Sequence, residues 1–297
     1  MSEYKLSSIL THGQVVHMAV IGCGGTGSAF ASGLPYLHQA MRALGLQGLQ
    51  VTLMDGDLIS ETNCVRQPFC RGEVGLHKSI VLASRLNQFW GLNWEAAPEY
   101  LTDKSKLDFD IVVGCVDTRN ARKLIHNLVT GKNSFVRLWL DIGNDADSGQ
   151  FVLGQPLNGR NKPSAERLRT VAELYPEVID FAEEKPGDPS CSALEALTRQ
   201  QPFVNQALAA QALALLSRLF WHGSIDYRGA FLNLATGKST PLPIDPRQWQ
   251  RLSRWNRRAA CAGEVGQQVG ITTECTYESL HNAVDFILDE PNEELVP

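Results

Sequence analysis

Long apolar segments are missing from this 297-residue chain. No run approaches the ~18 residues of a membrane-spanning helix, and no apolar signal-peptide core follows the first residues, MSEYKL. Basic residues are not in excess either, because the formal net charge is −5 and the pI is about 5.8, which provides no general attraction to nucleic acid. We therefore expect a cytoplasmic protein that binds neither membrane nor nucleic acid.

The cysteines form no metal-binding or redox motif. There are seven of them, and no C-x-x-C pair occurs anywhere in the chain. This excludes a zinc ribbon and a thioredoxin-type site, so we expect no zinc.

Segments with strand and helix patterns alternate along the chain, and 43% of the residues are hydrophobic, enough to bury a full core. We predict a Rossmann-like α/β fold, a mainly parallel sheet with helices on both faces and additional antiparallel strands toward the C-terminus. Expected strands are 15–21, 50–54, 111–115, 136–142, 150–154, 228–234 and 240–244. Expected helices begin at Thr26 (interrupted at Pro35) and span about 76–90, 164–175 and 202–221, with one more carrying Arg122.

Two parts are expected along the chain. Residues 1–244 form the main domain, with a mobile crossover at about 160–190 that contains the breaker run KPGDP. Residues 245–297 form a helical extension with an acidic tail. The apolar stripe of the 202–221 helix is interpreted as core or dimer contact.

A glycine-rich turn follows the first long strand. Gly22, Gly24 and Gly27 have G-x-G-x-x-G spacing, with Gly25 between them, and such turns let backbone N–H groups approach a phosphate at a helix N-terminus. The second strand ends at Asp55, whose carboxylate could accept the hydroxyls of a ribose. This combination predicts a nucleotide site.

The glycine motif alone favours NAD, but the polar residues that follow favour ATP. Asp57, Arg66, Lys78 and Asp117 supply two cations and further acids. An oxidoreductase does not need them beside its phosphates, whereas an enzyme that cleaves ATP must neutralise a triphosphate and hold Mg²⁺.

The order of these residues resembles the ThiF/MoeB/HesA family, the adenylating half of ubiquitin-activating enzymes and their bacterial sulfur-carrier relatives. The matching pattern is D-x-D-x(5)-N-x-x-R-Q, then G-x-x-K and C-x-D-x-x-x-x-R, and the resemblance runs from about 15 to about 233. Within the family the chain is most similar to the ThiF-type member of the PRTRC plasmid cassette. Unlike many MoeB-type relatives, it carries no zinc-binding C-x-x-C pairs.

The resemblance implies a set of ATP-binding residues. They are Gly22, Gly24, Gly25, Gly27, Asp55, Asp57, Asn63, Arg66, Gln67, Lys78, Asp117 and Arg122. Arg66 and Lys78 would contact the triphosphate and Asp117 would hold Mg²⁺. Some have structural alternatives: Asp57 as a turn cap, Asn63 and Gln67 as turn-forming residues or residues that support the site from behind, and Arg122 as an ion-pair partner.

One cysteine has a candidate catalytic role. Relatives of the ubiquitin-activating type carry a thioester-forming cysteine near the crossover, and Cys191 lies there. The alternative is a passive thiol, and we interpret Cys23, Cys64, Cys70 and Cys115 as small packed residues.

The resulting hypothesis is an ATP-dependent adenylyltransferase. It would activate the C-terminal carboxylate of a small ubiquitin-like or sulfur-carrier-like protein that ends in glycine, releasing pyrophosphate, and the resemblance implies a homodimer. Three alternatives remain: an NAD-dependent oxidoreductase, an enzyme that adenylates a small carboxylate, peptide or RNA-linked group, and a non-catalytic nucleotide-binding scaffold.

Overall fold

The structure, a computed structural model, describes residues 3–7, 13–179, 201 and 203–247. The chain divides into two compact units, Met1–Ile244 and Asp245–Pro297. Only residues 245–247 of the second unit are described. The following account therefore concerns the first unit.

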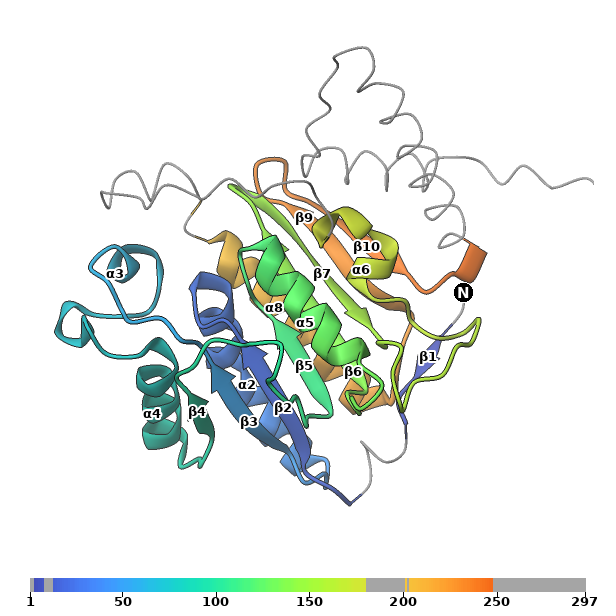
Figure 1. Ribbon diagram of the computed structural model, residues 1–297, viewed down its shortest axis with the longest axis horizontal. Coiled ribbons are helices and arrows are strands. Elements are labelled where there is room, and N and C mark those ends of the chain that lie inside the picture. Colours follow the sequence, from blue (N-terminus) through green and yellow to red (C-terminus); the bar gives the residue numbers. More distant parts are fainter. Residues whose placement is uncertain (1–2, 8–12, 180–200, 202, 248–297) are drawn as a thin grey trace, which may run out of the picture. The chain divides into compact units, whose positions relative to one another are not determined.

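An eight-stranded sheet runs through this unit in the order β10-β9-β7-β6-β5-β2-β3-β4 (Figure 1). The strands β2 to β6 are mutually parallel, and β7, β9 and β10 extend the sheet in antiparallel pairing. Their bounds are β2 Val16–Ile21, β3 Leu49–Met54, β4 Glu95–Ala97, β5 Ile111–Gly114, β6 Leu138–Asn144, β7 Ser148–Gly154, β9 Tyr227–Asn233 and β10 Lys238–Pro243. A separate two-stranded sheet pairs β1 (Tyr4–Lys5) with β8 (Ser224–Ile225). This architecture confirms the predicted fold class.

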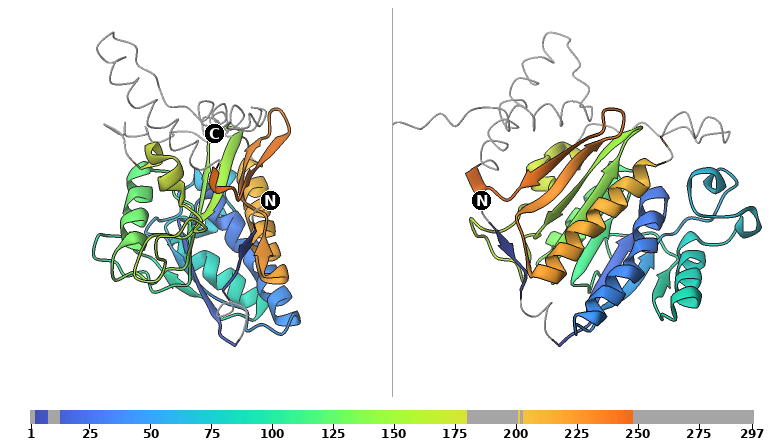
Figure 2. Two further views of the ribbon diagram at one scale, coloured as in Figure 1. Left: turned by 90° about the vertical axis from the view of Figure 1, so that its right-hand side faces the viewer. Right: turned by 180° about the vertical axis from the view of Figure 1, so that it is seen from behind.

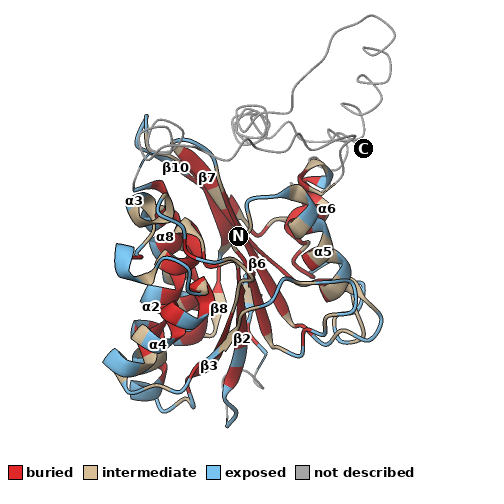
Figure 3. Cartoon of the chain, turned by 60° about the vertical axis from the view of Figure 1, so that its left-hand side comes forward, coloured by how far each residue is buried: buried red, intermediate tan, exposed pale blue. Residues whose placement is uncertain are grey.

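Helices cover both faces of the sheet (Figures 2 and 3). α2 (Gly25–Ala43), α4 (Lys78–Trp90) and α8 (Val204–His222) lie on one face, and α5 (Arg119–Thr130) and α6 (Val171–Leu174) lie on the other. The short elements are α3 (Asn63–Arg66), η1 (Arg71–Glu73) and η2 (Pro176–Val178). The central strands are buried on both sides, which explains their nearly continuous apolar sequences.

The helix α8 is part of the core. Its apolar stripe, predicted as core or dimer contact, is buried within the single chain: Leu208, Ala212, Leu215, Leu216 and Leu219. α8 packs alongside α2 (Figure 2). The approach is close, since a Cβ at Gly33 of α2 would overlap the side chain of Leu213.

Several sequence expectations differ from the structure. α2 continues through Pro35 as one helix, because proline removes only one intrahelical hydrogen bond and the surrounding face of α2 is buried. The helix expected over 164–175 is reduced to Val171–Leu174. The strand β4 and the pair β1–β8 were not predicted, since two or three residues carry too little periodicity. The expected helical extension beyond residue 247 and its acidic tail lie outside the described residues.

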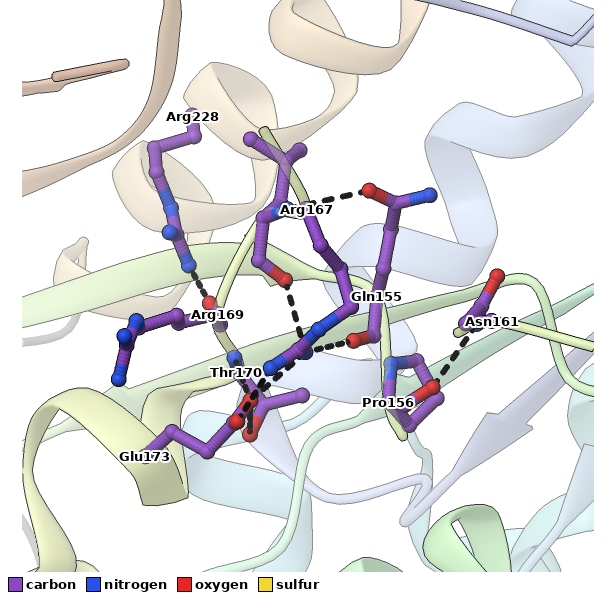
Figure 4. A network of polar contacts seen from close by, with 9 residues as sticks. Gln155, Pro156, Asn161, Arg167, Arg169, Thr170, Glu173 and Arg228 are labelled. Atoms are coloured by element: carbon purple, nitrogen blue, oxygen red, sulfur yellow. Dashed lines mark hydrogen bonds and ion pairs between the residues drawn. The ribbon is translucent and has the colours of Figure 1, made fainter. Parts of the chain in front are cut away.

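A buried polar network ties the segment after β7 to the sheet (Figure 4). The guanidinium of Arg167 donates to both carboxylate oxygens of Glu173, at 2.9 and 2.5 Å, and to the carbonyl oxygen of Gln155. Glu173 also accepts from the backbone N–H of Thr170 and so caps α6. Arg228 of β9 is fully buried, donates to the carbonyl oxygen of Arg169, and has its pKa lowered to about 9 by burial.

No helix in the described part of the chain is long and apolar enough to cross a membrane.

Candidate functional site

Parallel pairing brings the predicted site segments to one edge of the sheet. Ile21 is in register with Met54 of β3 on one side and with Gly114 of β5 on the other. The residues after these three strand ends, Gly22, Asp55 and Cys115, therefore lie side by side. The strand order also reverses at β2, the position at which open α/β sheets bind ligands.

Three of the four glycines in the turn are required for steric reasons. Gly22 has a φ of +91°, a left-handed conformation that side chains rarely adopt, and a Cβ there would lie 2.6 Å from the carbonyl oxygen of Cys115. A Cβ at Gly27 would overlap the carbonyl oxygen of Gly22. One at Gly25 would overlap the Asn205 amide of α8. Gly24 has open space around it, because a Cβ there would meet only Gln67 Nε2, at 3.9 Å.

Asp55 connects the end of β3 to the glycine turn. Its Oδ2 accepts from the N–H of Cys23 at 2.6 Å, and its Oδ1 accepts from the N–H of Asp57 at 2.8 Å. Burial raises the pKa of Asp55, while these two hydrogen bonds and Lys78 act in the opposite direction. Because a carboxylate can accept about four hydrogen bonds, the oxygens keep capacity for a ligand, and ribose binding stays a prediction.

Lys78 begins α4 and is almost completely buried. Its Nζ donates to Oδ2 of Asp57 at 2.8 Å, and the hydroxyl of Tyr100 donates to Oδ1 of the same carboxylate at 2.6 Å. Burial raises the pKa of Asp57, but the hydrogen bonds from Lys78 and Tyr100 outweigh it, so the pKa is lowered. The ammonium also acts electrostatically on Asp55 and Cys23, which places its charge near the glycine turn.

The loop after Asp57 carries Asn63, Arg66 and Gln67. Asn63 Oδ1 accepts from the N–H of Ser60 at 3.0 Å, which forms the turn before α3. Arg66 is the last residue of α3 and is half-buried. Gln67 points toward the glycine turn, as its distance to Gly24 indicates. Their roles at ATP stay predictions.

Asp117 and Arg122 follow β5. Asp117 is exposed just past the strand end, and the side chain of Thr118 caps α5 by accepting from Ala121 N–H. Arg122 has the ion-pair geometry that the sequence left open: its Nε lies 2.9 Å from Asp141 Oδ1, and its Nη2 donates to the carbonyl oxygen of Val116 at 3.0 Å. Arg122 thereby holds the backbone next to Asp117, and contact with nucleotide stays a prediction.

The residues present are compatible with a magnesium ion held largely by other ligands, and its binding stays a prediction. No group of three or more His, Cys, Asp or Glu side chains that could hold a metal occurs among the described residues. Mg²⁺ commonly uses one or two carboxylates plus phosphates and water, and the exposed Asp117 carboxylate meets that requirement.

The cysteines discussed above fall into three groups: buried, exposed, and outside the described residues. Cys23 and Cys115 lie inside the site region, and burial raises the pKa of each well above its usual value, which suits inert packed residues. Cys70 is exposed, so its interpretation as a packed residue was wrong; it is the N-cap of the short helix η1, whose residues are not buried either. Cys191 lies outside the described residues.

Three residues near the site were missed by sequence reasoning. Tyr100 follows the unpredicted β4, Asp141 lies within β6, and Asn205 lies in the first turn of α8. Asn205 Oδ1 is 2.8 Å from Thr26 Oγ1 in the first turns of α2. No local motif marked them, because each reaches its partner across a long sequence separation.

Comparison with solved structures supports the fold. The chain is similar to PaaA (16% identity, TM-score 0.53, 79% of this chain and 65% of that one). It is also similar to E. coli MccB with MccA-N7isoASN (18% identity, TM-score 0.53) and to E. coli MccB with ATP (18% identity, TM-score 0.50). Each of these two matches covers 80% of this chain and 65% of the other. The chain thus spans less than two thirds of the length of these proteins, 65% in each case.

No curated protein matches the chain. The sequence profile of the ThiF family does match part of it, and this match covers the glycine turn, Asp55, the 57–75 loop and Asp117. The matched residues, 11–135, make up less than half of the chain, and this match alone defines what is called its ThiF family segment.

Proposed function

We propose that this chain is an ATP-dependent adenylyltransferase. A carboxylate of its substrate attacks the α-phosphate of ATP, an acyl-adenylate forms, and pyrophosphate leaves. The ThiF family segment and the ThiF-like fold support this class of reaction.

One observation carries the proposal. A buried lysine, a glycine turn and two aspartates converge at the carboxyl edge of β2, β3 and β5, although they lie up to 56 residues apart from Gly22 to Lys78. Lys78 is held 2.8 Å from Asp57 rather than extended into solvent. A cation fixed beside backbone N–H groups suits the binding of a polyphosphate better than the binding of a nicotinamide cofactor.

The reaction needs positioning and charge neutralisation more than proton transfer. A substrate carboxylate is already ionised at neutral pH, so no strong general base is required. In this proposal Arg66, Lys78 and Asn63 bind the phosphates and Asp55 orients the ribose. Asp117 would hold Mg²⁺, which supplies further neutralisation of phosphate charge when bound.

The proposed substrate is the C-terminal carboxylate of a small ubiquitin-like protein that ends in glycine. The sequence resemblance to the PRTRC cassette protein supports a partner of this kind. Similar solved structures contain MccB together with ATP or with MccA-N7isoASN, so a neighbour of the same fold binds both a nucleotide and a second molecule. We also propose a homodimer. In a separate later step, the Cys191 thiolate would attack the acyl-adenylate, forming a thioester and releasing AMP.

Titration with ATP·Mg²⁺ and with NAD tests the nucleotide assignment. We expect ATP·Mg²⁺ to bind and NAD not to bind. Replacing Arg66→Ala should weaken ATP binding about tenfold or more, since a charge-assisted contact contributes ~1.5–3 kcal/mol. Asp117→Ala should abolish ATP–pyrophosphate exchange while leaving the circular dichroism spectrum unchanged.

Arg71→Ala is the matched control, because Arg71 is an exposed arginine five residues further along the same loop. It should bind ATP like the wild type. Binding of NAD that is indifferent to Arg66 would refute adenylation and favour an oxidoreductase. ATP binding without any pyrophosphate exchange, in the presence of glycine-tailed partners, would favour a nucleotide-binding scaffold.

A further inference from the structure

Tyr100 occupies an unusual position for an exposed tyrosine. It lies in the loop after β4, and 69% of its surface is exposed, yet its hydroxyl donates a 2.6 Å hydrogen bond to Asp57, 43 residues earlier. This hydrogen bond raises the pKa of Tyr100. The side chain is therefore tied to the site rather than free in solvent.

The aromatic ring lies against the backbone between the two site aspartates. A Cβ at Gly56 would lie only 2.7 Å from two ring atoms of Tyr100. Any other residue between Asp55 and Asp57 would push the ring away. The glycine of the D-G-D sequence thus leaves room for the Tyr100 ring at a position from which the hydroxyl reaches Asp57.

Asp57 connects Tyr100 to Lys78. Its Oδ1 accepts from Tyr100 and its Oδ2 from Lys78, so one carboxylate is held from both sides. A lysine side chain is a flexible stem with a point charge, and Asp57 fixes the position of that charge. An ammonium has three N–H donors; one is used on Asp57, which leaves two for phosphate oxygens.

We propose that Tyr100 is a positioning residue for the ATP phosphates, acting through Asp57 on Lys78. This inference rests on the proposed function and adds a residue that neither the glycine motif nor the ThiF-like pattern contains. The groups that face Asp57 in this arrangement are Lys78, Tyr100 and the neighbouring Asp55.

Tyr100→Phe tests the proposal because it removes only the hydroxyl and keeps the ring on Gly56. The dissociation constant for ATP·Mg²⁺ should rise about threefold to tenfold, the usual contribution of one hydrogen bond. Adenosine has no phosphate for Lys78 to bind, so its affinity, measured by competition against ATP, should stay unchanged. Tyr36→Phe, at an exposed tyrosine on α2, is the control and should change neither ligand.

A second experiment, in a protein already substituted at Asp57, tests whether Tyr100 acts through Asp57. In Asp57→Ala protein, Tyr100→Phe should weaken ATP binding no further, because alanine has no oxygen to accept the hydroxyl hydrogen bond. Equal losses for ATP and adenosine, or additive losses with Asp57→Ala, would overturn the proposal in favour of general disruption or ring stacking on the base.

A measurement without nucleotide separates this inference from the proposed function. NMR titration of the Asp57 carboxyl in the ligand-free protein should show a higher pKa in Tyr100→Phe than in the wild type. An unchanged Asp57 pKa would mean that Tyr100 does not donate a hydrogen bond to Asp57, and it would overturn the proposal. Wild-type protein that does not bind ATP would overturn the proposed function and this inference together, whereas an ATP affinity that is unchanged in Tyr100→Phe would overturn only the latter.

Discussion

At the scale of single residues, the glycines of the turn have distinct reasons to be glycine. Gly22 needs its positive φ, whereas Gly27 needs the space that a Cβ would take from the Gly22 carbonyl oxygen. The two glycines therefore hold the end of β2 against the start of α2, and this contact sets where the backbone N–H groups point.

Gly27→Ala should consequently destabilise the protein and remove nucleotide binding. Because the new methyl meets backbone rather than a movable side chain, we expect a loss of about 2–4 kcal/mol in the free energy of unfolding. Gly131→Ala is the matched control. Gly131 has a φ of −60°, and a Cβ there would lie 3.5 and 3.7 Å from its nearest neighbours, the carbonyl oxygens of Asn127 and Leu128. Urea unfolding and ATP titration measure both, and a Gly27→Ala protein as stable as Gly131→Ala would contradict the steric argument.

At the scale of elements, the Arg167–Glu173 pair anchors the segment between β7 and α6. Burial raises the pKa of Glu173, but hydrogen bonds from Arg167 and Thr170 lower it below its ordinary value of 4.5. An acid with a depressed folded-state pKa stabilises the protein above the unfolded pKa. That contribution is lost as the pH falls through the folded-state pKa.

Glu173→Gln should therefore lower the unfolding free energy at pH 7 by about 2–4 kcal/mol, since it leaves the buried Arg167 charge without its carboxylate. The difference from wild type should shrink in urea titrations below pH 4.5.

Glu177→Gln in η2 is the control with the opposite sign. Burial raises the pKa of Glu177, so its charged form costs stability as the pH rises, and the amide should be neutral or stabilising at pH 7. A Glu173 effect that does not vary with pH would indicate packing rather than charge.

At the scale of the whole molecule, the residues matched by the ThiF family model, 11–135, are only part of the first compact unit, Met1–Ile244. They end before β6, which pairs with β5, and before α8, which packs on α2. Without them the buried faces of β5 and α2 would be exposed to water.

We therefore expect a fragment of residues 1–135 to lack cooperative thermal unfolding. A fragment of residues 1–247, which contains the whole first unit, should retain it. Circular dichroism melting curves of the two fragments check this. A folded 1–135 fragment would contradict the dependence on α8 and β6, and an unfolded 1–247 fragment would contradict the predicted boundary near residue 244.

The sequence by itself determined the central strands, the long helices and the edge at which a ligand would bind. Period and composition are local properties, so β2 with its glycine turn and the apolar stripe of α8 can be read directly. The polar residues after parallel strands must also meet at one edge, because the register of those strands aligns their carboxyl ends.

Only the tertiary structure decided how those polar residues pair. Arg122 reaches Asp141, Tyr100 reaches Asp57, and Asn205 reaches Thr26. Such contacts depend on distances between elements that are far apart in the chain, and no periodicity or spacing encodes them. The packing of α8 on α2, the pairing of β6 with β5 and the pairing of β4 with β3 bring these partners together. The contacts of Asp57 with Tyr100 and of Arg122 beside Asp117 therefore became visible only in the folded molecule.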